Sequence, residues 1–139
     1  MKQAQTTIAI QTRGPGLYLF THDAAAFVSR EKIVKGLLTC FIRHTSASLV
    51  IQENADPDVL ADLEDFMRRL VSRDPMFYRH TTEGPDDMPS HIRSALTATS
   101  LTIPVRDGRL ALGTWQGLYL FEHRDHPHAR EILLHLLGE

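Results

Sequence analysis

The side chains best suited to chemistry begin with a polar segment, His44-Thr45-Ser46-Ala47-Ser48, set between two apolar stretches. Hydroxyl and imidazole groups in such a setting need hydrogen-bond partners or a cavity to face. One interpretation is a corner that binds an anion or a metal, with Thr45, Ser46 and Ser48 donating to phosphate oxygens. The alternative is a β-bulge whose hydroxyls, together with a locally bonded His44, satisfy its own backbone.

A second group of candidate ligands runs from His80 to His91 and includes Asp86 and Asp87. The two imidazoles lie on either side of a polar loop that enters a helix, so they can converge on one ion. Neutral imidazole and carboxylate are the usual ligands of zinc or another borderline divalent metal. The spacing matches no established local ligand pattern, and the alternative is a surface loop whose acids precede a helix N-terminus, where negative charge is favourable.

Two further groups are weaker candidates. Glu53 and Asn54 follow the strand after His44 and can approach the same cavity, although a solvated turn has the same pattern. Gln116 lies between two glycines in a strand-like segment, which indicates a bulge or a close backbone approach. It can bond a heterocycle or a phosphate, and the neighbouring Trp115 can stack on a ring or, as is commoner for a lone tryptophan, lie in the core.

Other reactive side chains are expected to be structural. His123, His126 and His128 crowd one turn with Pro127, which predicts an exposed turn rather than ligands. Cys40 lies in a strand of buried character, so an inert thiol is expected. Glycine-rich phosphate loops and a nucleophile elbow are absent from the sequence, which leaves dinucleotide, P-loop and α/β-hydrolase chemistry without support.

The elements that must position these groups are mostly strands. Alternating apolar residues predict a half-buried strand over 6–13, a turn at Gly14-Pro15-Gly16 and a short strand over 17–20, together a hairpin. An Asp107-Gly108 pair predicts a second hairpin. The remaining strands are expected at 37–43, 49–51, 100–105, 109–112 and 115–122, and residues 129–137 fit a strand better than a helix.

Three helices complete the expected fold. The first begins near Asp23 and should end at Gly36, where a C-cap belongs. The second has the clearest start, with Asp56 as the cap and Pro57 at the first helical position, and its apolar residues recur at helical spacing through Val71. The third starts at Pro89, and the stretch from Ser72 to Met88 is expected to be a long loop.

Length and composition limit the chain to one domain, residues 1–139. The net charge of −2 gives no basic excess to attract nucleic acid. No apolar run approaches the roughly 20 residues that span a bilayer, so no membrane association is expected. The residues after Met1 lack the apolar stretch of a signal peptide, and with Cys40 as the single cysteine they predict a reduced, cytoplasmic protein.

The polar segments occur in an order that resembles the YjbQ family. The matching segments are His44-Thr45-Ser46-Ala47-Ser48, Gln52-Glu53-Asn54-Ala55-Asp56-Pro57-Asp58, Glu83-Gly84-Pro85-Asp86-Asp87-Met88-Pro89 and Leu112-Gly113-Thr114-Trp115-Gln116-Gly117. The resemblance covers essentially the whole chain. It implies an α+β fold of two sheets, like a β-sandwich, with about seven or eight strands and three helices, assembled as a homotrimer. A trimer would also cover exposed sheet edges and apolar faces.

The resemblance further implies weak activity as a secondary thiamine-phosphate synthase. That reaction joins hydroxymethylpyrimidine diphosphate to thiazole phosphate and releases pyrophosphate, whose developing charge a divalent cation would stabilise. The family match suggests His44, His80 and His91 as ligands of zinc or magnesium. Asp87, Glu53 and Asn54 are the expected catalytic groups, with Asp87 orienting a histidine or acting as a base. The expected substrate contacts are Thr45, Ser46, Ser48 and Arg124 to phosphate, and Gln116 to the pyrimidine nitrogen.

Two other functions fit the same residues. The first is metal-assisted hydrolysis of a small phosphorylated metabolite, in which the same ligands would activate water. The second is a trimeric module without catalysis that binds a small anionic ligand or a partner protein. Release of phosphate without any thiazole acceptor would indicate hydrolysis rather than synthesis. The absence of turnover on any phosphorylated pyrimidine would indicate the binding module.

Overall fold

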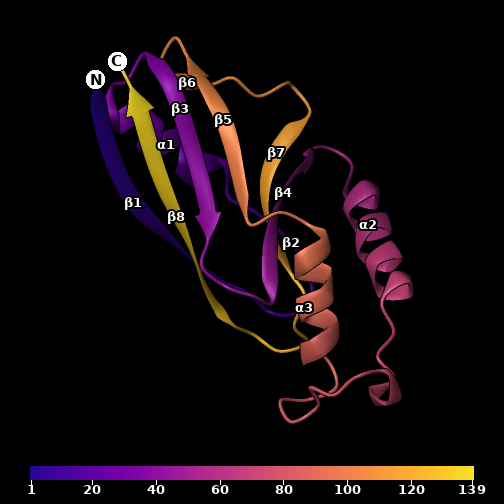
Figure 1. The fold of residues 1–139 in the computed structure, drawn as a ribbon. Coiled ribbons are helices and arrows are strands. Elements are labelled where there is room, and N and C mark those ends of the chain that lie inside the picture. Colours follow the sequence, from indigo (N-terminus) through magenta and orange to yellow (C-terminus); the bar gives the residue numbers. More distant parts are fainter.

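Two antiparallel sheets form the centre of the computed structural model, which describes residues 1–139 (Figure 1). One sheet has the strand order β1-β8-β3-β5-β6, and the other has the order β2-β7-β4. The strands are β1 Lys2–Gln11, β2 Gly16–Leu19, β3 Lys35–Ile42, β4 Ala47–Glu53, β5 Ser100–Arg106, β6 Arg109–Leu110, β7 Gln116–Glu122 and β8 Ala129–Gly138. The helices are α1 Thr21–Glu31, α2 Pro57–Leu70 and α3 Asp87–Leu96, with a 3-10 turn at Pro75–Phe77. The predicted α+β fold of two sheets with three helices is confirmed.

One apolar cluster joins both sheets to α1. Strand β3 shows how the sequence builds it, because Leu38 and Cys40 alternate inward and are fully buried, while Leu37 and Phe41 point to the other face and are 46% and 45% exposed. The predicted buried strand is therefore buried on one face only. Cys40 is buried as expected, and burial raises the pKa of its thiol to about 12, which supports the expectation of an inert thiol.

The predicted hairpin at Gly14-Pro15-Gly16 is wrong. Strand β1 pairs along its whole length with β8 in the five-stranded sheet, whereas β2 pairs with β7 in the three-stranded sheet. The turn therefore carries the chain from one sheet to the other. Both Gly14 and Gly16 have positive φ angles there. The Asp107-Gly108 hairpin between β5 and β6 is confirmed, and both of its turn residues adopt positive φ.

Helix α1 ends earlier than predicted. Lys32 takes the left-handed conformation that closes the helix, with φ of 57°, and Gly36 lies inside β3 instead of at a C-cap. Gly36 is opposite Gly138 of β8, and a Cβ added to Gly36 would overlap the carbonyl oxygen of Leu137. Glycine is needed at this position because two backbones approach closely, not because a helix ends there.

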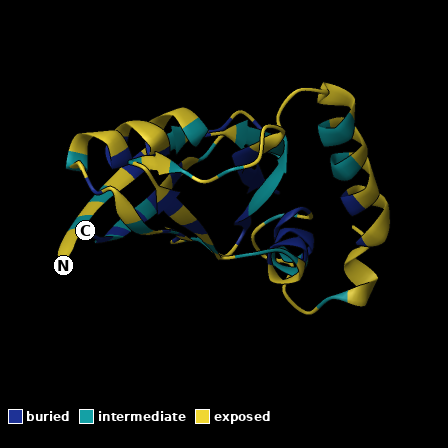
Figure 2. Cartoon of the chain, turned by 90° about the horizontal axis from the view of Figure 1, so that it is seen from above, coloured by how far each residue is buried: buried dark blue, intermediate teal, exposed yellow.

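Helix α2 begins as predicted, since the backbone N–H of Asp58 donates to Asp56 Oδ1 at 2.9 Å. Its apolar face is only partly covered: Met67 is buried, while Phe66 and Leu70 are exposed. Helix α3 is much more deeply buried than α2 (Figure 2). Arg93 of α3 ties the two helices together by donating from Nε to the Met67 carbonyl at 3.1 Å. Helix α3 starts at Asp87, two residues before the predicted Pro89.

The structure excludes the core alternative for Trp115, and the exposed turn predicted for His123 is wrong. Trp115 lies before β7 and is 63% exposed, so it is not a core residue. His123 lies directly after the buried strand β7 and is itself buried, with its Nε2 2.9 Å from Ser48 Oγ, so it does not belong to an exposed turn. Burial and the nearby Arg93 charge lower the pKa of His123 to about 3.

None of the helices has the length and apolar character that crossing a membrane requires. The cytoplasmic location stays a prediction.

Candidate metal centre

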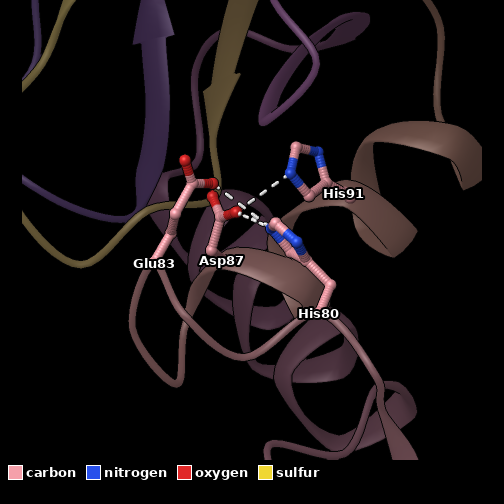
Figure 3. A group of neighbouring side chains, drawn as sticks. All are labelled: His80, Glu83, Asp87 and His91. Carbon is pink, nitrogen blue, oxygen red and sulfur yellow. Dashed lines mark hydrogen bonds and ion pairs between the residues drawn. The ribbon is translucent and has the colours of Figure 1, made fainter.

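Four potential ligands converge at the start of α3 (Figure 3). His80 and Glu83 come from the loop before the helix. Asp87 and His91 lie one helical turn apart, a spacing that places both side chains on one face. One ligand atom from each of the four residues lies within 4.8 Å of the ligand atoms of the others. The structure therefore brings together the two histidines that flank the loop.

Asp87 is at the centre of the group. Its Oδ2 lies 2.6 Å from His80 Nε2 and 3.1 Å from His91 Nε2. His80 Nε2 is also 3.2 Å from Glu83 Oε2. The Asp87 side chain is almost fully buried, whereas those of His80 and Glu83 are 41% and 64% exposed. The cluster thus has a buried carboxylate at its base and an opening toward solvent.

The orientation of His91 fits a metal ligand. His91 Nδ1 lies 2.9 Å from the Thr45 carbonyl oxygen, which can only accept, so Nδ1 carries a hydrogen. A neutral His91 ring then presents the lone pair of Nε2 to Asp87 Oδ2, which is also an acceptor. Two acceptors at 3.1 Å need a proton or a cation between them. A backbone carbonyl that fixes the far nitrogen is the usual support of a metal-bound histidine.

Arg124 holds the acidic residues in place. Its Nη1 lies 2.8 Å from Asp87 Oδ1, and its Nε lies 2.8 Å from Asp86 Oδ2. The backbone N–H of Asp125 also donates to Asp86 Oδ2 at 3.0 Å. Arg124, predicted to bind phosphate, is thus engaged by two carboxylates in this structure. Asp87 keeps Oδ2 directed at the two imidazoles because Oδ1 faces the guanidinium.

Local charges shift the protonation of the cluster in opposite directions. The hydrogen bond with Asp87 raises the pKa of His80 above its ordinary value of 6.5, against a smaller effect of burial. Burial alone would raise the pKa of Asp87, but the hydrogen bond with His80 and the charges of His91 and Arg124 outweigh it and hold that pKa below the usual range. In the absence of metal, His80 therefore keeps its proton to higher pH than an unperturbed histidine.

Zinc affinity is accordingly expected to rise with pH. Zinc binds the neutral imidazole and must displace the proton of His80. Because the pKa of His80 is raised, that proton already competes with zinc at pH values above 6.5. A titration with a chromophoric chelator between about pH 5.5 and 8 measures this. The affinity should fall steadily as the pH is lowered across that range. An affinity independent of pH would show that His80 is not a ligand.

His44, the third predicted metal ligand, lies outside the group of four. Its Nε2 accepts a hydrogen bond from the backbone N–H of Glu131 at 2.9 Å. Burial and the nearby Arg130 charge lower the pKa of His44. His44 and Thr45 nevertheless line a cavity of about 260 Å³ that His91 also borders. His44 and Thr45 thus lie beside the cluster, but His44 is not one of its four potential ligands.

The other predicted hydroxyls face the protein interior. Ser46 is buried, and its Oγ accepts from Arg130 Nη2 at 3.0 Å. Ser48 is fully buried between His123 Nε2 and the hydroxyl of Thr97, which donates to it at 2.6 Å. Neither serine borders the cavity beside His91. Of the three hydroxyls predicted to bind phosphate, only that of Thr45 is exposed.

Glu53, Asn54 and Gln116 form a separate group at the other end of the three-stranded sheet. Glu53 pairs with Gln116 across β4 and β7, and six residues along the same ladder Ala47 pairs with Glu122. A strand of that length spans about 20 Å. Asn54 Nδ2 donates to the Thr114 carbonyl at 3.1 Å, and Gln116 Oε1 accepts from the Gly113 N–H at 2.7 Å. Within one chain, these residues do not reach the cluster of His80 and His91.

Two features of the site region were not predicted. Glu83 joins the ligand group, and the only sequence signal for it is its position three residues after His80 and four before Asp87. Glu122 and Arg130 form a fully buried ion pair beside the segment of His44 to Ser48, with Arg130 Nε 2.8 Å from Glu122 Oε1. A charged residue at the end of the apolar run of β7 was the available signal for that pair.

Comparisons with known proteins identify the family. Residues 6–139 match the UPF0047 protein YjbQ-like family. A UPF0047 protein of Synechocystis is 56% identical over 138 residues, which is 99% of this chain and 94% of the relative. The UPF0047 protein YjbQ of Salmonella typhimurium is 46% identical over 136 residues, with 97% of this chain and 98% of the relative covered. The chain belongs to the YjbQ/UPF0047 family, and the predicted resemblance is confirmed.

Solved structures agree with the fold. A conserved hypothetical protein from Thermus thermophilus is 34% identical and superposes with a TM-score of 0.85 over 95% of this chain and 99% of its own. A YbjQ-like protein of unknown function from Sulfolobus solfataricus has a TM-score of 0.86 over 99% of this chain and 100% of its own, at 21% identity. The latter shows the fold alone. None of these names specifies a reaction, so family and fold are what the comparisons establish.

Proposed function

We propose that His80, Glu83, Asp87 and His91 bind a divalent cation and that this centre makes the protein an enzyme acting on a small phosphorylated metabolite. The observation that carries the proposal is the convergence of the four ligand atoms within 4.8 Å, with one nitrogen of His91 already fixed by a carbonyl. Two imidazole nitrogens among four donors favour zinc over magnesium, which prefers oxygen ligands.

The reaction proposed first is the synthesis of thiamine phosphate. The cation would supply charge that offsets the negative charge of the departing pyrophosphate. The chain's own groups prepare the site: the Thr45 carbonyl orients His91, and Arg124 leaves one oxygen of Asp87 free to face the imidazoles. The exposed Thr45 hydroxyl lies next to the cluster and is available to a phosphate oxygen.

Hydrolysis is the second candidate, and the openness of the cluster favours it. Glu83 is 64% exposed and His80 is 41% exposed, so water reaches the ligand positions freely. A transferase gains by excluding water from its reactive intermediates, whereas a hydrolase needs water at the same place. In the hydrolytic reaction, three of the four residues would hold the cation and leave a position for water, and the remaining carboxylate, Asp87 or Glu83, would be within reach of its proton.

One incubation separates the functions. The zinc-loaded protein is mixed with hydroxymethylpyrimidine diphosphate, with and without thiazole phosphate, and the products are resolved by chromatography. A synthase forms thiamine phosphate and releases pyrophosphate only when the acceptor is present, whereas a hydrolase releases phosphate or pyrophosphate without it. No product in either tube, with zinc bound, would contradict the enzymatic proposal and favour a binding module. Asp87→Asn is the negative control: because it lacks the central carboxylate of the cluster, it should form no product.

We also propose that the protein is a homotrimer. The support is the exposed apolar surface of β3, where Leu37 and Phe41 lie on the face away from the core. Exposed apolar side chains on a sheet face commonly mark a protein interface. Light scattering should give three times the chain mass of 15.7 kDa. A mass of one chain at micromolar concentration would contradict the trimer and leave the metal centre unaffected.

A further inference from the structure

A second binding position lies directly beside the candidate metal centre. It is a cavity of about 260 Å³ that shares His91 with the cluster, and its lining residues are His44, Thr45, His91, Ser94, Ala95 and Thr99. The lining contains no carboxylate, lysine or arginine. A cavity of about 150 Å³ is large enough for benzene, so this one has room for a single substituted ring. The space therefore suits a small, uncharged organic group.

The hydrogen bonds of His44 settle which of its nitrogens carries the hydrogen. The backbone N–H of Glu131 donates to Nε2 at 2.9 Å, and a backbone N–H can act only as a donor. Nε2 is therefore unprotonated, and the hydrogen of the neutral ring lies on Nδ1. With Nε2 bonded to the backbone and Nδ1 protonated, His44 has no free lone pair to offer a metal ion.

The Nδ1–H group of His44 is free to bind a ligand. No hydrogen bond within the chain involves His44 Nδ1, and no buried side-chain nitrogen or oxygen lacks a partner, so this atom must be accessible to solvent. Two other polar side chains around the cavity, Ser94 and His91, are already engaged within the chain. Ser94 Oγ donates to the Ala47 carbonyl at 2.9 Å, and His91 Nδ1 bonds to the Thr45 carbonyl. The hydroxyls of Thr45 and Thr99 can rotate, so the donor whose direction is fixed by a ring is His44 Nδ1–H.

We propose that this cavity binds the uncharged ring of the substrate, and that His44 donates from Nδ1 to an acceptor atom of that ring. The ligand class is a phosphate or diphosphate ester of a small heterocycle with a ring nitrogen or carbonyl oxygen. The placement of its phosphate at the neighbouring cluster rests on the proposed function, whereas the binding of the ring does not. This gives His44 a substrate-binding role and places the ring contact here, not at Gln116.

Two substitutions of His44 separate the roles of its nitrogens. In His44→Asn the amide N–H takes approximately the position of Nδ1–H, and in His44→Gln the amide oxygen takes approximately that of Nε2 and can accept from Glu131. The probe is hydroxymethylpyrimidine, the uncharged alcohol, titrated into the metal-free and zinc-loaded protein and followed by NMR. We expect His44→Gln to weaken its binding about tenfold, the value of one hydrogen bond, and His44→Asn to weaken it less than about threefold.

Benzyl alcohol provides the matched ligand, because it has the same size but no ring acceptor. Its binding should be weaker than that of the pyrimidine and equal in wild type and His44→Gln. Zinc affinity should be unchanged in both variants. Loss of zinc binding in His44→Gln would make His44 a metal ligand and overturn the inference, as would pyrimidine binding that is absent in wild type or unaffected by the substitution. If wild type binds the pyrimidine through His44 but no zinc, the proposed function fails and this inference stands.

Discussion

Replacing His91 by alanine is expected to lower the affinity of the protein for zinc by about 100-fold or more, because loss of even a supporting group outside the ligand set costs 10- to 100-fold. His91 is the better fixed of the two histidines in the cluster. Its Nδ1 is held by the Thr45 carbonyl at 2.9 Å, whereas the only side-chain partners of His80 are the two carboxylates of the same cluster. A fixed ring loses little entropy when the metal binds, so its removal has the larger effect.

The measurement is competition with a chromophoric chelator, together with elemental analysis of the purified protein. His22→Ala is the matched control, since His22 is an exposed histidine on α1 outside the cluster. The control should bind zinc like wild type. His80→Ala should fall between the two, and the far-ultraviolet circular dichroism of each variant should be unchanged. Equal zinc affinity of His91→Ala and wild type would exclude the proposed centre and the enzymatic function built on it.

Local sequence signals predicted individual elements well. Asp56 and Pro57 marked the start of α2, because a side-chain acceptor followed by a residue without an N–H suits only a helix N-terminus. Asp107-Gly108 predicted the β5–β6 hairpin, because its two residues readily adopt positive φ. These signals depend on the backbone conformation of one or two residues, so they need no knowledge of the rest of the fold.

Pairing between distant segments was not predictable in the same way. Alternation in β1 indicates a strand, but it does not reveal that the partner is β8, more than a hundred residues away. Glycine suits a C-cap, so the local sequence predicts a helix end at Gly36, whereas the actual role of Gly36 depends on Gly138 in a strand far along the chain. Such errors arise where the requirement on a residue comes from a tertiary contact.

The candidate site shows the same division. His80, Asp87 and His91 lie within twelve residues, so a loop leading into a helix brings them together through local geometry alone. His44 lies just before β4, which packs against α3, and the sequence reveals neither this contact nor which nitrogen of His44 is free. Gln116 and Glu53 are close to each other, but the length of β4 and β7 separates them from the cluster.

Replacing Glu122 by glutamine is expected to lower the free energy of unfolding by about 3–5 kcal/mol, because it leaves the buried Arg130 guanidinium without a counter-charge. Both side chains are buried, and the carboxylate accepts from Arg130 Nε at 2.8 Å and from the Thr12 hydroxyl at 2.7 Å. Arg130 Nη2 also donates to Ser46 Oγ, so the pair fixes the segment whose Thr45 carbonyl orients His91. The substitution should therefore weaken zinc binding as well.

Glu131→Gln is the matched control on the same strand. Glu131 pairs with Arg43 at 3.8 Å, and both side chains are more than half exposed, so its loss should change the free energy of unfolding by less than about 1 kcal/mol. Urea denaturation of both variants at pH 7 makes the comparison. A difference between the two variants below about 1 kcal/mol would show that the Glu122–Arg130 pair is not a main determinant of stability.

Acid unfolding provides an independent check on the same pair. Burial opposes the charge of Glu122, but the hydrogen bonds from Arg130 and Thr12 outweigh it and hold its pKa below the ordinary value of 4.5. A carboxyl whose pKa is lower in the folded protein stabilises the fold above its unfolded pKa and loses that contribution as the pH falls. Wild type should therefore lose stability as the pH drops below 4.5, and Glu122→Gln should lose less over the same interval because it has no carboxyl to protonate. Parallel acid-unfolding curves for the two proteins would assign the acid sensitivity to other carboxylates.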